Sequence, residues 1–150
     1  MKHKRSNIGT VSHGTMKASD LVPAFIYELR AQTPTRRAHL SLCARIEKAI
    51  DSCADYDLSE DIDFDLEELF DALNEYAPEG FYFGAHPGDG ADFGFWLSES
   101  FIEDFDGLKV DGLSQVPRGY SGLVLDVNDH GNVSLYKASR GRLRELWAIV

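Results

Sequence analysis

One stretch of the chain, residues 84–92, brings together side chains that could do chemistry. It holds His86, Asp89 and Asp92 among glycines and a proline. An imidazole and two carboxylates could converge on a divalent metal ion, or could act as an acid and base pair. The same Gly and Pro content is what a tight hairpin loop requires for backbone reasons alone. A structural or contact loop is therefore the first interpretation, and a metal-assisted enzyme is the alternative.

A second candidate for metal binding is the run Asp61-x-Asp63-x-Asp65. Alternate acids at positions one, three and five open a calcium-binding EF-hand loop. The remaining requirements fail, because Leu66 stands where the turn glycine belongs and Ala72 stands where the bidentate Glu is needed. The run is better explained as a solvated acidic face at the start of a helix.

The sequence offers no other catalytic pattern. The five histidines are scattered, and none pairs with a cysteine at metal-ligand spacing. The two cysteines, Cys43 and Cys53, fall on one predicted helix, where ten residues put them about 15 Å apart and beyond the reach of a disulfide. We therefore expect neither a cofactor nor nucleophilic catalysis.

The strongest signal is a polarised distribution of charge. Residues 49–108 contain eighteen Asp and Glu and no Lys or Arg, whereas residues 1–48 contain nine basic and three acidic residues. A field of one sign repels nucleic acid and anionic membranes, and it attracts a basic protein surface. We therefore predict a basic macromolecular partner, with no direct binding of nucleic acid and no membrane.

Helical periodicity occupies the first half of the chain. Apolar residues at steps of three and four predict helices over residues 20–32, 35–53 and 65–76. Asp65 and Glu68 form a plausible capping box for the third helix, and Ala77-Pro78 with Gly80 ends it. The outer face of that helix carries Glu67, Asp71 and Glu75 at steps of four.

Short strands follow in the second half. Aromatic runs at residues 81–83 and 93–96 predict a hairpin around the 84–92 loop, and a short helical turn is expected at 100–106. Strands over 122–127, 132–136 and 143–150, with turns at 128–131 and 139–141, predict a meander. The expected fold is α+β, with about three N-terminal helices packed on a C-terminal antiparallel sheet of four to five strands.

The chain length predicts one domain, over residues 16–150, preceded by a basic flexible arm at residues 1–15. The aromatic content is too high for a disordered acidic tail, so the acidic block should fold. No apolar run is long enough to span a membrane, and the start of the chain lacks the apolar stretch of a signal peptide. The default location is the cytoplasm.

The candidate partner-binding residues are the exposed acids of this block. They are Asp57, Glu60, Asp61, Asp63, Glu67, Glu68, Asp71 and Glu75, aided by Glu103 and Asp104. Duplex DNA carries about one charge per 1.7 Å, whereas a single stripe of acids on a helix carries one per about 6 Å. One stripe is too sparse to imitate DNA, so mimicry would need a second row from the chain or from a second copy in a homodimer.

Several segments resemble short proteins of phages and mobile elements that have no assigned activity. The similarity lies in residues 83–84, 88–96, 127–133, 135–136 and 142–147, which belong to the second half of the chain. Small acidic phage proteins are often counter-defence factors, including anti-restriction and anti-CRISPR proteins. The resemblance implies that class, in the cytoplasm of the host cell, and it transfers no site residues.

Together these observations favour a non-enzymatic inhibitor or adaptor that covers the basic nucleic-acid-binding surface of a host defence complex. An immunity protein for a basic toxin is the alternative among binding proteins. The metal-assisted enzyme at His86, Asp89 and Asp92 is the alternative among enzymes. Acidity kept for solubility alone remains open as well, although mixed charge signs would serve solubility equally.

Overall fold

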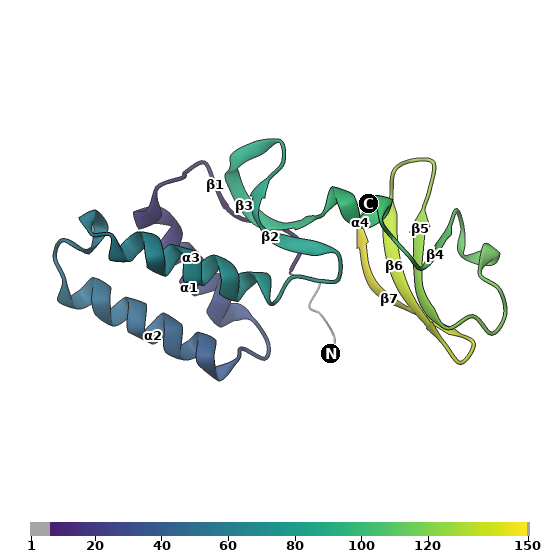
Figure 1. Cartoon of the computed structure of the whole chain (residues 1–150), viewed down its shortest axis with the longest axis horizontal. Helices are drawn as coiled ribbons and strands as arrows, with labels where there is room; N and C mark the ends of the chain where they lie inside the picture. Colours follow the sequence, from purple (N-terminus) through teal and green to yellow (C-terminus); the bar gives the residue numbers. More distant parts are fainter. Residues whose placement is uncertain (1–6, 150) are drawn as a thin grey trace. The chain divides into compact units, whose positions relative to one another are not determined.

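The computed structural model describes residues 7–149, which form an α+β protein and divide into two compact units after Leu97 (Figure 1). The expected fold class is confirmed. The single domain expected over residues 16–150 stays a prediction. Within residues 7–149 we find no helix that is both long enough and apolar enough to cross a membrane.

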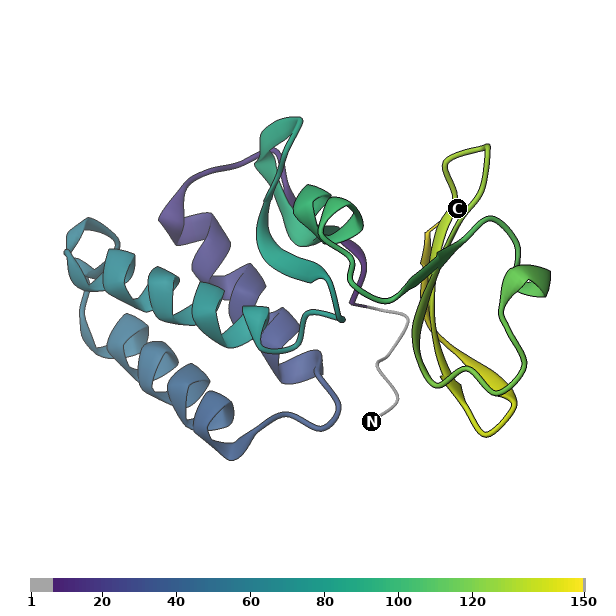
Figure 2. The ribbon, with the colours of Figure 1, turned by 45° about the vertical axis from the view of Figure 1, so that its right-hand side comes forward.

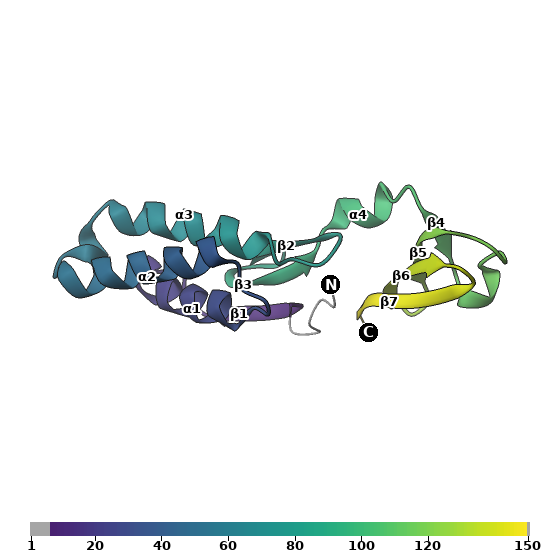
Figure 3. The same ribbon diagram turned by 90° about the horizontal axis from the view of Figure 1, so that it is seen from below.

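Three helices dominate the first unit, and the periodicity predicted all of them. They are α1 (Ala18–Ala31), α2 (Arg37–Ser52) and α3 (Asp61–Asn74), with a 3-10 turn at Tyr56–Leu58 before α3. Figure 3 shows the three helices running alongside one another. The third helix begins at Asp61, four residues earlier than expected. Asp65 therefore lies inside the helix and does not form the predicted cap.

A three-stranded antiparallel sheet completes this unit. Its strands are β1 (Gly9–His13), β2 (Phe81–His86) and β3 (Asp89–Leu97), in the order β1-β3-β2 (Figure 2). The hairpin expected from the aromatic runs is confirmed, but its loop is much shorter than residues 84–92. Cross-strand pairing continues from Phe81 opposite Leu97 to His86 opposite Asp89, which leaves only Pro87 and Gly88 between the strands.

The core of the first unit lies between this sheet and the helices. Phe25 of α1 is fully buried, and its ring meets Phe70 of α3 and Phe83 of β2 edge to face, at 5.0 and 5.1 Å between ring centroids. Phe83 pairs with Phe95 across the strands, at 4.9 Å. Aromatic rings bury large areas and favour such geometry. The helices α1 and α3 therefore pack on the aromatic residues of β2 and β3.

The first strand differs from the expected basic arm. Residues 9–13 pair with the edge of β3, and Asn7 is buried and donates hydrogen bonds to Gln32 and to the carbonyl of Tyr76, both at 2.8 Å. The close approach of β1 requires a glycine at position 94, where an added Cβ would lie 2.1 Å from the carbonyl oxygen of Gly9. Residues 1–6 of the expected arm lie outside the described residues.

The second unit contains a separate sheet of four strands. After α4 (Glu99–Glu103) come β4 (Leu108–Val110), a 3-10 turn at Leu113–Gln115, β5 (Gly122–Val127), β6 (Val133–Ser139) and β7 (Arg142–Ile149), in the order β4-β5-β6-β7. The β5-β6-β7 meander is confirmed. The expectation of one wholly antiparallel sheet is wrong, because β4 pairs parallel to β5 and the hairpin of the first unit belongs to its own sheet.

Both turns of the meander form where the sequence placed them. The side-chain oxygen of Asn128 accepts hydrogen bonds from the backbone N–H groups of His130 and Asn132, at 3.0 Å each. In the second turn Arg140 and Gly141 have φ of +53° and +75°, the positive values that a two-residue hairpin turn needs. His130 therefore belongs to a structural turn.

Candidate acidic interface

All ten carboxylates predicted for partner binding are solvent-exposed. Eight of them lie in the first unit, in or beside the 3-10 turn and α3. The other two, Glu103 and Asp104, lie at the end of α4 in the second unit. Because α3 is continuous from Asp61 to Asn74, the acids along it share one rigid element.

Two of the eight carboxylates are paired within the protein. Glu68 accepts a hydrogen bond from Arg45 at 3.1 Å. Glu75 forms an ion pair with Arg36 and lies 3.5 Å from the ring of His39. Both arginines come from the region of α2, so the basic face of that helix neutralises one side of α3. The sequence located these charges but not the pairing between them.

The remaining six carboxylates make no ion pair or hydrogen bond through their side chains to any other residue in the range 7–149. They form what we call the acidic surface: Asp57, Glu60, Asp61, Asp63, Glu67 and Asp71. Glu67 and Asp71 lie one helical turn apart, about 5–6 Å between Cβ atoms. Uncompensated like charges at this distance oppose helix formation by a few tenths of a kcal/mol.

Position along α3 separates these acids into two groups. Asp61 and Asp63 lie in the first turn, where carboxylates interact favourably with the positive end of the helix dipole. Asp71 lies in the last turn, where the dipole favours a cation, and that turn contains no basic residue. Helix stability therefore accounts for the first group and not for Asp71.

A buried carboxylate, that of Asp65, connects the 3-10 turn and α3 to α2. Asp65 is 4% exposed, and it accepts a hydrogen bond from the hydroxyl of Tyr56 at 2.7 Å and another from Arg45 at 3.1 Å. Burial, together with the hydrogen bond to Asp65, raises the pKa of the Tyr56 phenol. The predicted capping role of Asp65 is thus replaced by a link that joins the 3-10 turn, α2 and α3.

Two large apolar side chains are exposed in the same segment as the acidic surface. Leu58 is 89% exposed and Phe64 is 63% exposed. Phe64 lies on α3 with Glu60 and Asp61 one turn before it and Glu67 and Glu68 one turn after it. Sequence reasoning missed both residues. The sequence did contain a signal for Phe64, because its position does not follow the helical spacing of the apolar face formed by Leu69 and Leu73.

The structure does not gather the three candidate residues of the hairpin, His86, Asp89 and Asp92, into a metal-binding cluster. His86 accepts a hydrogen bond from the N–H of Gly88 and packs edge-on against Trp96, at 4.7 Å between ring centroids. Asp89 lies 3.2 Å from the ring nitrogen of His13, and Asp92 sits further along β3. Throughout the described range, no three His, Cys, Asp or Glu side chains are placed to hold a metal ion. The two-residue turn places His86 opposite Asp89, whereas Asp92 pairs with His13 of β1.

The carboxylate of Asp89 has a different role. The backbone N–H of Ala91 and the His13 side chain both stabilise its ionised form, and they lower the pKa of Asp89. Asp89 therefore ties the hairpin turn to the end of β1.

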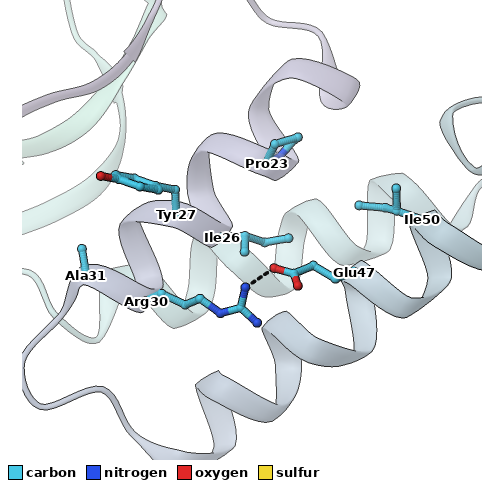
Figure 4. Close-up of a pocket in the computed structure, with 7 residues that line it drawn as sticks. All are labelled: Pro23, Ile26, Tyr27, Arg30, Ala31, Glu47 and Ile50. Atoms are coloured by element: carbon cyan, nitrogen blue, oxygen red, sulfur yellow. Dashed lines mark hydrogen bonds and ion pairs between the residues drawn. The ribbon is translucent and has the colours of Figure 1, made fainter.

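A groove of about 700 Å³ lies between α1 and α2 of the first unit (Figure 4). Its lining includes Pro23, Ile26, Tyr27 and Ile50, and the Arg30–Glu47 ion pair crosses it. The cation and the carboxylate neutralise each other, and the remaining lining residues are apolar apart from the phenol of Tyr27. This groove therefore offers mainly apolar contact.

Comparisons of the chain with protein-family models, with curated proteins and with solved structures found no match.

Proposed function

We propose that this protein is a non-enzymatic inhibitor or adaptor whose acidic surface binds the basic nucleic-acid-binding surface of another protein complex. The observation that carries the proposal is the set of six exposed carboxylates on and beside α3 that no cation of the described chain neutralises. Such a surface attracts cationic protein surfaces and raises their association rate.

The placement of Asp71 favours a binding role over solubility. A carboxylate in the last turn of a helix, next to a like charge at Glu67, costs a small amount of stability. Solubility would be served by acids at positions that cost nothing, or by mixed charge signs. A partner that presents lysines and arginines would recover that cost on binding.

The proposal requires competition for a basic surface and not a copy of the DNA geometry. The acids free on α3 are spaced by a helical turn, so their charge density along the axis is several times lower than that of a duplex. The acids before α3, at Asp57 and Glu60, broaden the surface but do not raise its charge density to that of a duplex. A dense negative patch can still exclude nucleic acid from a groove by occupying it.

The resemblance to small phage and mobile-element proteins suggests where such a complex would be found. The resemblance implies that the partner is a defence nuclease of the host and that the protein acts in the host cytoplasm. The acidic surface itself specifies only a basic, nucleic-acid-binding protein.

The test compares two double variants that change the net charge by the same four units. In Glu67→Lys/Asp71→Lys the reversals fall on the acidic surface, and in Asp111→Lys/Asp129→Lys they fall on exposed acids of the second unit. Each immobilised protein is used to capture complexes from a host lysate, which are then eluted with rising salt. The wild type and the second variant should retain the partner, and the first variant should lose it.

The captured complex is then assayed for nucleic-acid binding with and without added wild-type protein. Inhibition by the wild type, and none by Glu67→Lys/Asp71→Lys, is the expected result. Equal capture by all three proteins, independent of salt, would reject the acidic surface as the binding site. Capture of a toxin that does not bind nucleic acid would favour the immunity-protein alternative.

A further inference from the structure

The exposed apolar residues of the acidic surface form a pattern of their own. Phe64 presents most of its ring to water at 63% exposure, and Leu58, on the turn just before α3, is almost fully exposed at 89%. Single exposed apolar side chains are common on proteins. Here, however, the helix places carboxylates both one turn before and one turn after the aromatic ring.

This arrangement matches the anatomy of a protein interface on a small scale. Interfaces have an apolar centre surrounded by a polar rim, and aromatic residues dominate among those whose loss weakens binding most. Unpaired carboxylates lie on both sides of Phe64, at Glu60 and Asp61 before it and at Glu67 after it, whereas Glu68 is already paired with Arg45. Charge complementarity therefore fixes the chemistry of the occupant: an apolar stripe with cations on both sides.

We propose that Phe64, assisted by Leu58, is an apolar anchor that directs the acidic surface to a cationic amphipathic segment of its partner, in which lysines and arginines flank the apolar residues. This inference rests on the proposed function and narrows it. A polycation without apolar residues satisfies the carboxylates but leaves the Phe64 ring in water. An amphipathic segment satisfies both, so it binds more tightly and depends less on salt.

The test uses two synthetic peptides of equal length and equal positive charge. One is an amphipathic helix with lysines flanking a stripe of leucines, and in the other the leucines are replaced by serines. Binding of each labelled peptide to the full chain is measured by fluorescence anisotropy at low and at high salt. The leucine peptide should bind about tenfold more tightly, and its advantage should persist at high salt.

Matched variants then assign the contact to residues. Phe64→Gln/Leu58→Gln removes the anchor, and Tyr27→Gln/Ile50→Gln removes two exposed apolar residues that line the groove between α1 and α2 (Figure 4). The first variant should lose about tenfold in affinity for the leucine peptide and keep its affinity for the serine peptide. The second variant should bind both peptides as the wild type does. Circular dichroism and urea unfolding check that each variant is folded.

The outcomes separate this inference from the function on which it rests. Unchanged affinity of Phe64→Gln/Leu58→Gln for the leucine peptide would overturn the anchor, and so would a loss confined to Tyr27→Gln/Ile50→Gln, which would move the contact to the groove. In both cases the acidic surface could still bind cations. If Glu67→Lys/Asp71→Lys binds both peptides as tightly as the wild type, the proposed function itself is rejected.

Discussion

The hydroxyl of Tyr56 donates a 2.7 Å hydrogen bond to the buried carboxylate of Asp65, and this contact holds the start of the acidic segment against α3. Arg45 of α2 approaches the other oxygen of the same carboxylate. A buried charge with two partners is costly to disturb, because the remaining partner no longer satisfies it. The placement of the acidic surface therefore depends on Asp65, a buried acid that is not part of that surface.

Removing the Tyr56 hydroxyl should destabilise the protein. We expect Tyr56→Phe to lower the free energy of unfolding by about 1–3 kcal/mol, because Asp65 stays buried and loses a donor. Urea denaturation followed by circular dichroism measures the change. Tyr27→Phe is the matched control, since Tyr27 is 78% exposed and its substitution should stay within about 0.5 kcal/mol. Equal stability of the two variants would contradict the structural role of the Tyr56–Asp65 contact.

The same contact predicts a pH dependence at the alkaline end. The folded protein holds the proton of Tyr56 more tightly than the unfolded chain, whose tyrosines titrate near pH 10. The contribution of Tyr56 is therefore fully present below about pH 10 and is lost as the pH rises further, by at most about 1.4 kcal/mol per pH unit. Urea titrations at several alkaline pH values should show a steeper loss of stability for the wild type than for Tyr56→Phe. Parallel profiles would be inconsistent with a raised pKa at this position.

Asp71 should be a residue at which stability and binding change in opposite directions. Asp71→Lys replaces the repulsion from Glu67 with an attraction between opposite charges and puts a cation in the last turn of α3, so we expect a gain of about 0.5 kcal/mol in unfolding free energy. Binding to the basic partner should weaken. Asp63→Lys is the comparison variant, because it also removes a repulsion from Glu67 but puts a cation at the unfavourable end of the helix dipole, so its gain in stability should be smaller. Thermal unfolding of the two variants decides the sign, and a loss of stability in Asp71→Lys would refute the argument.

The strand β1 should depend on the glycine opposite it. Gly94→Ala places a Cβ 2.1 Å from the carbonyl oxygen of Gly9, so β1 must move away from β3 and the unfolding free energy should fall by about 1–3 kcal/mol. Hydrogen exchange should show faster exchange of the β1 amides in this variant. Gly90→Ala is the control, since an added Cβ there meets no atom within 4 Å. Protection of β1 that survives in Gly94→Ala would argue against the pairing.

Local patterns predicted much of the fold. The helices α1 and α2 match the apolar periodicity to within two residues, and the Asn128 and Arg140–Gly141 turns form where residue type demanded them. The misses involve pairing between distant residues. The edge strand β1 and the short parallel strand β4 have weak local signals, and both are held by neighbours that are far away in the sequence.

The sequence by itself determined that residues 49–108 carry negative side chains and no Lys or Arg, and that α3 presents acids at helical spacing. Both follow from residue type and local periodicity. Only the tertiary structure decided which acids stay free. Arg36 and Arg45 reach Glu75 and Glu68 from 39 and 23 residues away, Asp65 is buried beneath Tyr56, and Phe64 is left in water. Charge adds along a chain, but its neutralisation depends on which helices pack together, and that packing is set by the aromatic core around Phe25.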